Sequence, residues 1–269
     1  MNRLLRVRIN VSDLARLTDF YCEALGFVVV QMAERGVRLR LGAQTLELVQ
    51  PEVPGAPYPA DSRATDVWFQ HVALVVSDMA AAYAHLCRHA MTPITIGGPQ
   101  RLPPSTGRVQ AFKFRDPDGH PLELLAFPPG AGDAHWQSGD ALFLGYDHSA
   151  LVVSDVTRSI AFYEALGLVV AGRTLNHGPE QERLDDAPGV RVDVVALRAA
   201  AEATPHVELL GYQVPPVTPL PGPLAPSDIA SSRLVFESDR AAELHDPDGH
   251  AIVLVQSPLT QSPAGYASR

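Results

Sequence analysis

Apolar and polar positions follow a pattern that recurs along the chain. Its clearest copy runs from His148 to Gly167, HSALVVSDVTRSIAFYEALG, and similar stretches begin at Arg6 and His71. In each copy, apolar residues alternate with others up to a Ser-Asp pair, and an amphipathic stretch follows. Alternation is typical of a half-buried strand, and Ser-Asp before a helical period indicates a helix start. The sequence therefore predicts a repeated strand–helix unit.

Short apolar stretches separated by turn signals complete each unit. In the first unit these stretches are 27–32, 37–41 and 45–49. Asp-Pro-Asp-Gly at 116–119 and again at 246–249 indicates a hairpin, because Pro presets its backbone angle and Gly tolerates positive φ. The fourth unit, 229–256, has too few residues for a helix after Ser238. We expect an α+β fold of four βαβββ units, the fourth lacking its helix.

Proline-rich segments separate the units. They cover 51–66, 128–140 and 213–228, and proline cannot donate to a sheet ladder, so they are read as linkers. The predicted division is 1–130 for a domain of units one and two, 141–258 for a domain of units three and four, and 259–269 for a mobile tail.

Charge and composition exclude several classes of partner. The 269 residues have a formal net charge of -9 and no block of Lys or Arg, so neither nucleic acid nor a membrane surface is an expected partner. The sequence lacks the run of about 18 apolar residues that a membrane span needs, and it begins without the apolar core of a signal peptide. We expect a cytoplasmic protein that acts on a small molecule.

The repeated units resemble a known superfamily. Four βαβββ units, Ser-Asp helix starts, the helix end from Phe20-Tyr21 to Leu25-Gly26 and the Asp-Pro-Asp-Gly hairpins are together similar to the vicinal oxygen chelate superfamily. That superfamily contains glyoxalase I, methylmalonyl-CoA epimerase, extradiol dioxygenases and the bleomycin resistance proteins. The resemblance implies two half-barrel domains, in which paired units enclose a cleft for a divalent metal. Four units in one chain need no second chain for a cleft, so we expect a monomer or a homodimer.

The resemblance also implies the metal ligands. They lie in the first strand, six residues before the Ser of Ser-Asp, and as a Glu in the last strand. The residues at these positions in units two and three are His71, Glu123, His148 and Glu208. Those in units one and four are Arg6, Glu47, Ser232 and Val253. Pairing of the units in order would damage both clefts, whereas pairing of the middle units would give one complete site, which we favour.

Elementary chemistry supports these four residues as a site. A carboxylate flanked by leucines, such as Glu123, is costly to bury unless a positive charge compensates it. A lone His or Glu at such a position is more often a core, rim or solvated residue, but equivalent pairs in adjacent units favour a site. Two imidazoles and two carboxylates suit Fe, Zn, Mn, Ni or Co.

Three functions are compatible with this reading. The preferred one is a metal-dependent, glyoxalase- or epimerase-like isomerase or lyase, in which Glu123 or Glu208 is the catalytic proton shuttle. The first alternative is an Fe(II) extradiol ring-cleavage dioxygenase, and the second is a metal-free protein that binds a drug or small ligand. The insertion at 176–189 is expected to form a short helix over the sheet, where Glu180 and Arg183 are candidate substrate contacts.

Overall fold

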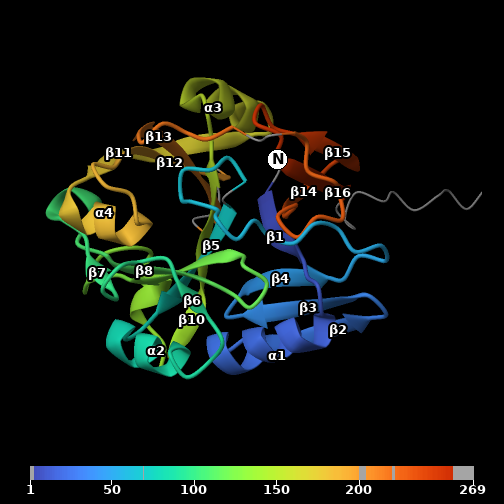
Figure 1. Ribbon diagram of the computed structural model, residues 1–269, viewed down its shortest axis with the longest axis horizontal. Coiled ribbons are helices and arrows are strands. Elements are labelled where there is room, and N and C mark those ends of the chain that lie inside the picture. The colour runs from blue at the N-terminus through green and yellow to red at the C-terminus, as the bar shows by residue number, and fades with distance from the viewer. Residues whose placement is uncertain (1–2, 69, 200–203, 220–221, 257–269) are drawn as a thin grey trace, which may run out of the picture.

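The protein consists of two mixed sheets with helices packed against them (Figure 1). The computed structural model describes residues 3–68, 70–199, 204–219 and 222–256. Its helices are α1 (Leu14–Leu25), α2 (Met79–Leu86), α3 (Val156–Ala165) and α4 (Pro179–Asp185), with 3-10 turns η1 (Pro104–Thr106) and η2 (Ala134–Gln137). None of the helices in these ranges has the length and apolar character needed to cross a membrane.

The nine-stranded sheet joins units two and three, in the order β11-β12-β13-β10-β5-β9-β8-β6, with β7 on β8. Unit two supplies β5 (Gln70–Val76), β6 (Thr92–Pro93), β7 (Gln100–Arg101), β8 (Gln110–Arg115) and β9 (Pro121–Ala126). Unit three supplies β10 (Phe143–Val152), β11 (Leu168–His177), β12 (Arg191–Ala199) and β13 (His206–Val214). The two first strands, β5 and β10, pair antiparallel at the centre, so the middle units form one sheet.

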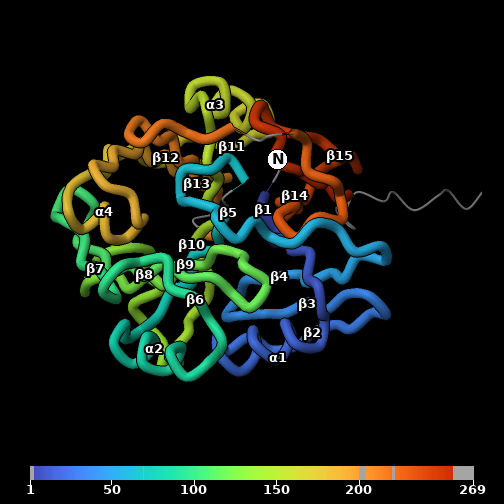
Figure 2. Tube along the Cα trace, in the orientation of Figure 1, coloured from blue at the N-terminus to red at the C-terminus, as the bar shows by residue number. Residues whose placement is uncertain are grey.

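The seven-stranded sheet joins units one and four, in the order β15-β16-β14-β1-β4-β3-β2. Unit one supplies β1 (Arg3–Asn10), β2 (Val28–Ala33), β3 (Gly36–Leu41) and β4 (Gln44–Val49). Unit four supplies β14 (Arg233–Ser238), β15 (Ala242–His245) and β16 (Ala251–Gln256). Figure 2 shows the red C-terminal strands beside the blue N-terminal strand β1. Residues 233–256 contain no helix, as predicted for unit four.

The Ser-Asp pairs have two separate roles. Asp13, Asp78 and Asp155 are the N-caps, and each side chain accepts a hydrogen bond of 3.0 Å from a backbone N–H of its helix. The preceding Ser12 instead donates from Oγ to Asp118 of the unit-two hairpin, at 2.7 Å, and Ser154 contacts Asp248 of the unit-four hairpin in the same way. The sequence pair thus starts a helix and anchors the next unit.

The unit contacts bear on the predicted domains in two ways. Each sheet combines strands from both predicted domains, whereas the serine contacts connect unit one with two and unit three with four. The boundaries 1–130 and 141–258 therefore stay a prediction, and the predicted tail lies outside the described residues.

The strand register of unit four differs from the sequence prediction. The strand expected from residue 229 begins at Arg233. Arg8 pairs with Arg233, just as Ala73 pairs with His148, so Arg233 and not Ser232 is the counterpart of His148. The prediction was wrong by one residue, because the chain turns at 229–230 and the strand begins only at Arg233.

Alternation along the strands separates an apolar face from a polar one. Val7 and Ile9 of β1 are buried in the same core as Leu17 and Tyr21 of α1, so the helix covers the apolar face. Arg6 and Arg8 have the other parity and lie on the opposite face. The nine-stranded sheet uses its corresponding face for the candidate site.

Candidate metal centre

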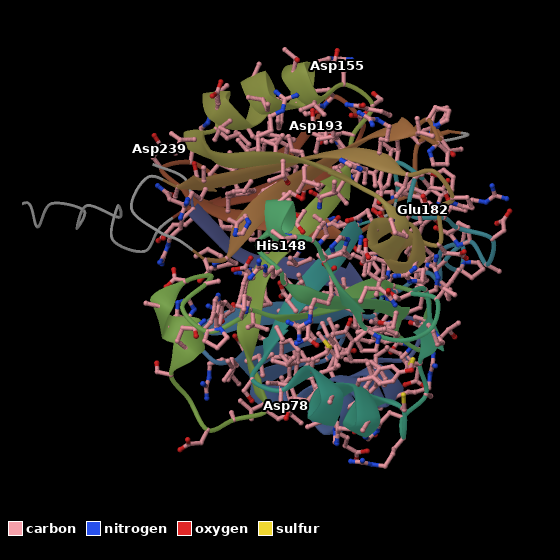
Figure 3. All side chains as sticks on the ribbon, turned by 90° about the vertical axis from the view of Figure 1, so that its left-hand side faces the viewer. Asp78, His148, Asp155, Glu182, Asp193 and Asp239 are labelled. Atoms are coloured by element: carbon pink, nitrogen blue, oxygen red, sulfur yellow. The ribbon has the colours of Figure 1, made fainter. Side chains whose placement is uncertain are left out.

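The four predicted ligands come together on one face of the nine-stranded sheet. They lie on four adjacent strands, with His71 on β5, Glu123 on β9, His148 on β10 and Glu208 on β13. His71 pairs with Ala150 and His148 with Ala73, so small residues separate the imidazoles across the strand pair. Figure 3 shows His148 well inside the molecule, far from the helix starts at Asp78 and Asp155.

The donor atoms lie close together. His71 Nε2 is 3.1 Å from Glu123 Oε2, and His148 Nε2 is 3.9 Å from that oxygen and 3.3 Å from Glu208 Oε2. One ligand atom each of His71, Glu123 and His148 lies within 4.8 Å of the others, and Glu208 is outside that trio. All four residues line a cavity of about 340 Å³ that also has apolar walls such as Leu102 and Leu210.

Burial and neighbouring charges shift the pKa values of these groups in opposite directions. Burial lowers the pKa of His71 to about 4, so its imidazole is neutral at pH 7. Burial also opposes the charge on His148, but Glu208 and Asp147 outweigh it and raise the pKa to about 9. Burial would raise the pKa of Glu123, yet Lys113 and His71 lower it to about 2. The site thus combines a neutral imidazole, a cationic imidazole and a fixed carboxylate.

Lys113 is a buried lysine next to the candidate ligands, and its place in the site was not predicted from the sequence. Lys113 of β8 pairs with Glu123 across the strands and donates to Asp185 of α4 at 2.6 Å. Tyr212 and Gln181 donate to the other oxygen of Asp185, at 3.1 and 2.8 Å. The alternation Phe112-Lys113-Phe114 could have indicated this position. Phe112 and Phe114 are buried on the other face of the sheet, so Lys113 points toward the cavity.

Asp147 is the second residue that sequence reasoning missed. The Nδ1–H of His148 donates to Asp147 Oδ2 at 3.0 Å, and Trp136 donates to the other carboxylate oxygen at 3.2 Å. Neighbouring residues in a regular strand point to opposite faces, but the β5–β10 register shifts between Tyr146 and His148. This irregularity lets adjacent residues meet. When a His binds metal through one ring nitrogen, a carboxylate hydrogen-bonded to the other ring nitrogen holds the orientation of the imidazole.

The donor set passes a direct test of fit to a divalent metal. Ligands about 2.1 Å from a four- to six-coordinate ion are separated by about 3.0–3.4 Å, and the contacts of 3.1 and 3.3 Å agree with that spacing. Among the described residues, none makes a hydrogen bond with the buried Nε2 of His148. Such a nitrogen, surrounded by carboxylate oxygens, suits a metal ligand.

The insertion forms α4, as predicted, but it presents different residues to the cavity. Gln181 and Leu184 line the cavity, whereas Glu180 and Arg183 are not among its lining residues. Arg183 Nε donates to Gln100 at 2.7 Å, and Arg183 Nη2 lies 4.0 Å from Glu180 Oε1. A role for Glu180 and Arg183 in binding substrate therefore stays a prediction.

Comparison with known proteins agrees with this architecture. The sequence profile of the Glyoxalase/Bleomycin resistance protein/Dioxygenase superfamily matches residues 3–124. The uncharacterized protein YaeR of Escherichia coli (strain K12) is 35% identical over 126 residues, which are 44% of this chain and 91% of YaeR. Catechol-2,3-dioxygenase of Bacillus subtilis (strain 168) is 26% identical over 125 residues, 45% of this chain and 40% of that protein. Glyoxalase I from Zea mays has a TM-score of 0.62 at 17% identity, with 95% of this chain and 92% of that chain covered.

Paired βαβββ units with helices on the outer faces define a vicinal oxygen chelate fold, as the resemblance implied. The chain belongs to the Glyoxalase/Bleomycin resistance protein/Dioxygenase superfamily.

Proposed function

We propose that the protein is a metal-dependent enzyme, a glyoxalase- or epimerase-like isomerase or lyase for a small substrate with two neighbouring oxygens. The observation that carries this proposal is the convergence of two imidazoles and two carboxylates in one buried cavity. His71, Glu123 and His148 would hold the ion, with Glu208 beside them. When bound, a divalent metal acts as a Lewis acid toward substrate oxygens.

Glu208 is the better candidate for the base, and Glu123 for the ligand. The pKa of Glu123 is held at about 2 by Lys113 and His71, and a carboxylate with so low a pKa is a weak base. The side chain of Glu208 is 19% exposed, lines the cavity and is outside the trio of ligand atoms. In the proposed reaction, Glu208 takes a proton from a carbon next to a substrate carbonyl and returns it.

Proton exchange tests this division of roles. Hydroxyacetone in deuterated buffer, followed by NMR, reports exchange at the carbon next to the carbonyl. We expect Glu208→Gln to keep stoichiometric metal and lose exchange, and Glu123→Gln to lose metal. Glu47→Gln, at the matching position of the other sheet, should change neither. Exchange by Glu208→Gln at the wild-type rate would refute Glu208 as base.

One observation favours a second candidate, an Fe(II) extradiol dioxygenase. The trio His71, Glu123 and His148 is a two-His, one-carboxylate set, which is typical of non-haem iron oxygenases. The similarity to a catechol-2,3-dioxygenase agrees with it. Elemental analysis and absorption spectra of anaerobically purified protein, with catechol as probe, decide between the two. Ferrous iron with ring cleavage would replace the isomerase proposal.

A metal-free binding protein is the outcome if neither test finds metal. The decisive variant is His148→Ala/Glu208→Ala, which removes the unit-three half of the site. Stoichiometric metal in that variant would show that units one and two bind the ion alone. Cytoplasmic location and a monomeric or homodimeric state stay predictions.

A further inference from the structure

The seven-stranded sheet carries arginines at the positions of the two candidate histidine ligands. Strand pairing gives the match, because Arg8 lies beside Glu47 as Ala73 lies beside Glu123. The matched residues are Arg6 with His71, Arg8 with Ala73, Arg38 with Lys113, Glu47 with Glu123, Arg233 with His148 and Val253 with Glu208. The four arginines and Glu47 are called the arginine cluster below.

The cluster forms a row across four neighbouring strands. Arg233 of β14 is opposite Arg8 of β1, Arg8 is beside Glu47 of β4, and Glu47 is opposite Arg38 of β3. Like charges directly opposite each other in a sheet are destabilising. Arg8 and Arg233 are nevertheless directly opposite in the strand pair, and this face has an excess of positive charge.

Glu47 is the carboxylate that accepts hydrogen bonds from two arginines of the row. Arg6 Nε donates to Glu47 Oε2 at 2.9 Å, and Arg8 Nε donates to the same oxygen at 3.1 Å. Arg233 donates to neutral acceptors, the Pro226 carbonyl at 2.7 Å and Asn10 Oδ1 at 3.4 Å. Glu243 of β15 pairs with Val253 and adds a second negative charge near Arg233. Four guanidinium groups therefore face two carboxylates among the described residues.

One nitrogen of the row has an unmet hydrogen bond. Among the described residues, none accepts from the buried Nε of Arg38. Glu237, the acidic residue of β14, accepts from Arg3 at 2.6 Å. The row therefore combines excess charge with a free donor, and both favour an additional acceptor.

The cluster is accessible from solvent although its stems are partly buried. The side chains of Arg6 and Arg8 are 13% and 30% exposed, and that of Glu47 is 17% exposed. Burial, followed by the charge of Arg8, lowers the pKa of Arg233. Helix α1 packs on the opposite face of this sheet and leaves the arginine face uncovered by helix (Figure 1).

We propose that the arginine cluster binds a small oxyanion, the carboxylate or phosphate group of an organic molecule, at a site separate from the metal centre. Guanidinium groups match the geometry of such oxygens through paired N–H donors, and their partial burial strengthens the interaction. The anion would lie over the row, where it would accept from arginines such as Arg38 and reduce the repulsion between Arg8 and Arg233.

Calorimetric titration of the metal-loaded protein with inorganic phosphate and with citrate, at constant ionic strength, tests the site. We expect saturable binding of one of the two, which identifies the preferred group. Arg38→Gln and Arg233→Gln should each weaken binding about tenfold, the effect of losing a charge-assisted hydrogen bond. Arg158→Gln, the same charge change on exposed α3, is the matched control and should bind normally.

Two further arms make the result decisive. His148→Ala should bind the anion as wild type does, and circular dichroism establishes that each variant is folded. Equal binding by Arg38→Gln, Arg233→Gln and Arg158→Gln would overturn the proposal, as would no saturable binding by wild type. Loss of binding in His148→Ala alone would place the anion on the metal centre and also overturn it.

Discussion

The two sheets repeat one backbone arrangement, but arginines take the positions of His71, Ala73 and His148 in the seven-stranded sheet. In the nine-stranded sheet, carboxylates surround His148, while in the seven-stranded sheet arginines surround Glu47. Lys113 and His71 lower the pKa of Glu123 to about 2 against the effect of burial, and Arg6 and Arg8 lower that of Glu47 in the same way. The βαβββ unit therefore determines which side chains lie close together. The residue types at those positions then determine whether the group of side chains suits a bound cation or a bound anion.

The largest expected difference between the sheets is in metal binding. His148→Ala removes a central ligand and should reduce bound divalent metal to background, whereas Arg233→Ala, at the matched position, should keep one equivalent per chain. Both variants are measured by elemental analysis after gel filtration. Loss of metal in both variants would contradict the prediction that metal binding depends on the nine-stranded sheet alone.

The second difference concerns the buried lysine and its counterpart. Lys113→Met leaves Asp185 buried without its cation and should lower the free energy of unfolding by about 3–5 kcal/mol. Arg38→Met removes a partly exposed charge from a cationic row and should change it by less than about 1 kcal/mol. Urea denaturation measures both values. Lys113→Met/Asp185→Leu should recover much of the loss; a double variant as unstable as the single would contradict the charge argument.

A smaller effect is expected from the carboxylate behind His148. Asp147→Asn keeps the shape but weakens the orienting bond to Nδ1, and metal affinity should fall about 10–100-fold. Asp19→Asn is the control, because Asp19 is exposed on α1, the helix of the other sheet. Titration with Co(II), followed by its visible spectrum, gives affinity and geometry together. Unchanged affinity with an unchanged spectrum would show that Trp136 and packing alone orient the imidazole.

Much of this site was predictable because the repeat fixes it. In units two and three, a His lies six residues before the Ser of Ser-Asp and a Glu lies in the last strand, and alternation turns both to one face. The sequence allowed two pairings of the units, and only the structure shows β5 beside β10. Sheet partners distant in the chain leave no local signal.

The missed residues have specific physical causes. Asp147 follows Tyr146 and precedes His148, so a regular strand would place it on the face opposite His148; the register shift cancels that rule. The face of α4 that meets the cavity depends on how the Lys113–Asp185 pair holds the helix, and a seven-residue helix shows too little periodicity to reveal it. Arg183 was predicted to touch substrate because it lies in the insertion, and it is outside the cavity lining.

The smallest predicted effect is a pH dependence confined to the arginine cluster. The pKa of Glu47 is lowered from its ordinary value of 4.5, with Arg6 and Arg8 outweighing burial. The folded protein thus favours the ionised form, and the unfolded chain binds the proton more readily on acidification. The contribution of Glu47 should be complete above the ordinary pKa and fade as pH falls toward the lower, folded value. This contribution to the free energy of unfolding should be on the order of 1 kcal/mol, because the arginines are partly exposed.

Urea denaturation of wild type, Glu47→Gln and the exposed control Glu34→Gln, at about pH 7 and about pH 3.5, measures this contribution. The stability gap between wild type and Glu47→Gln should shrink in acid while that of Glu34→Gln stays constant; a gap independent of pH would mean that Glu47 acts through packing and not through its charge.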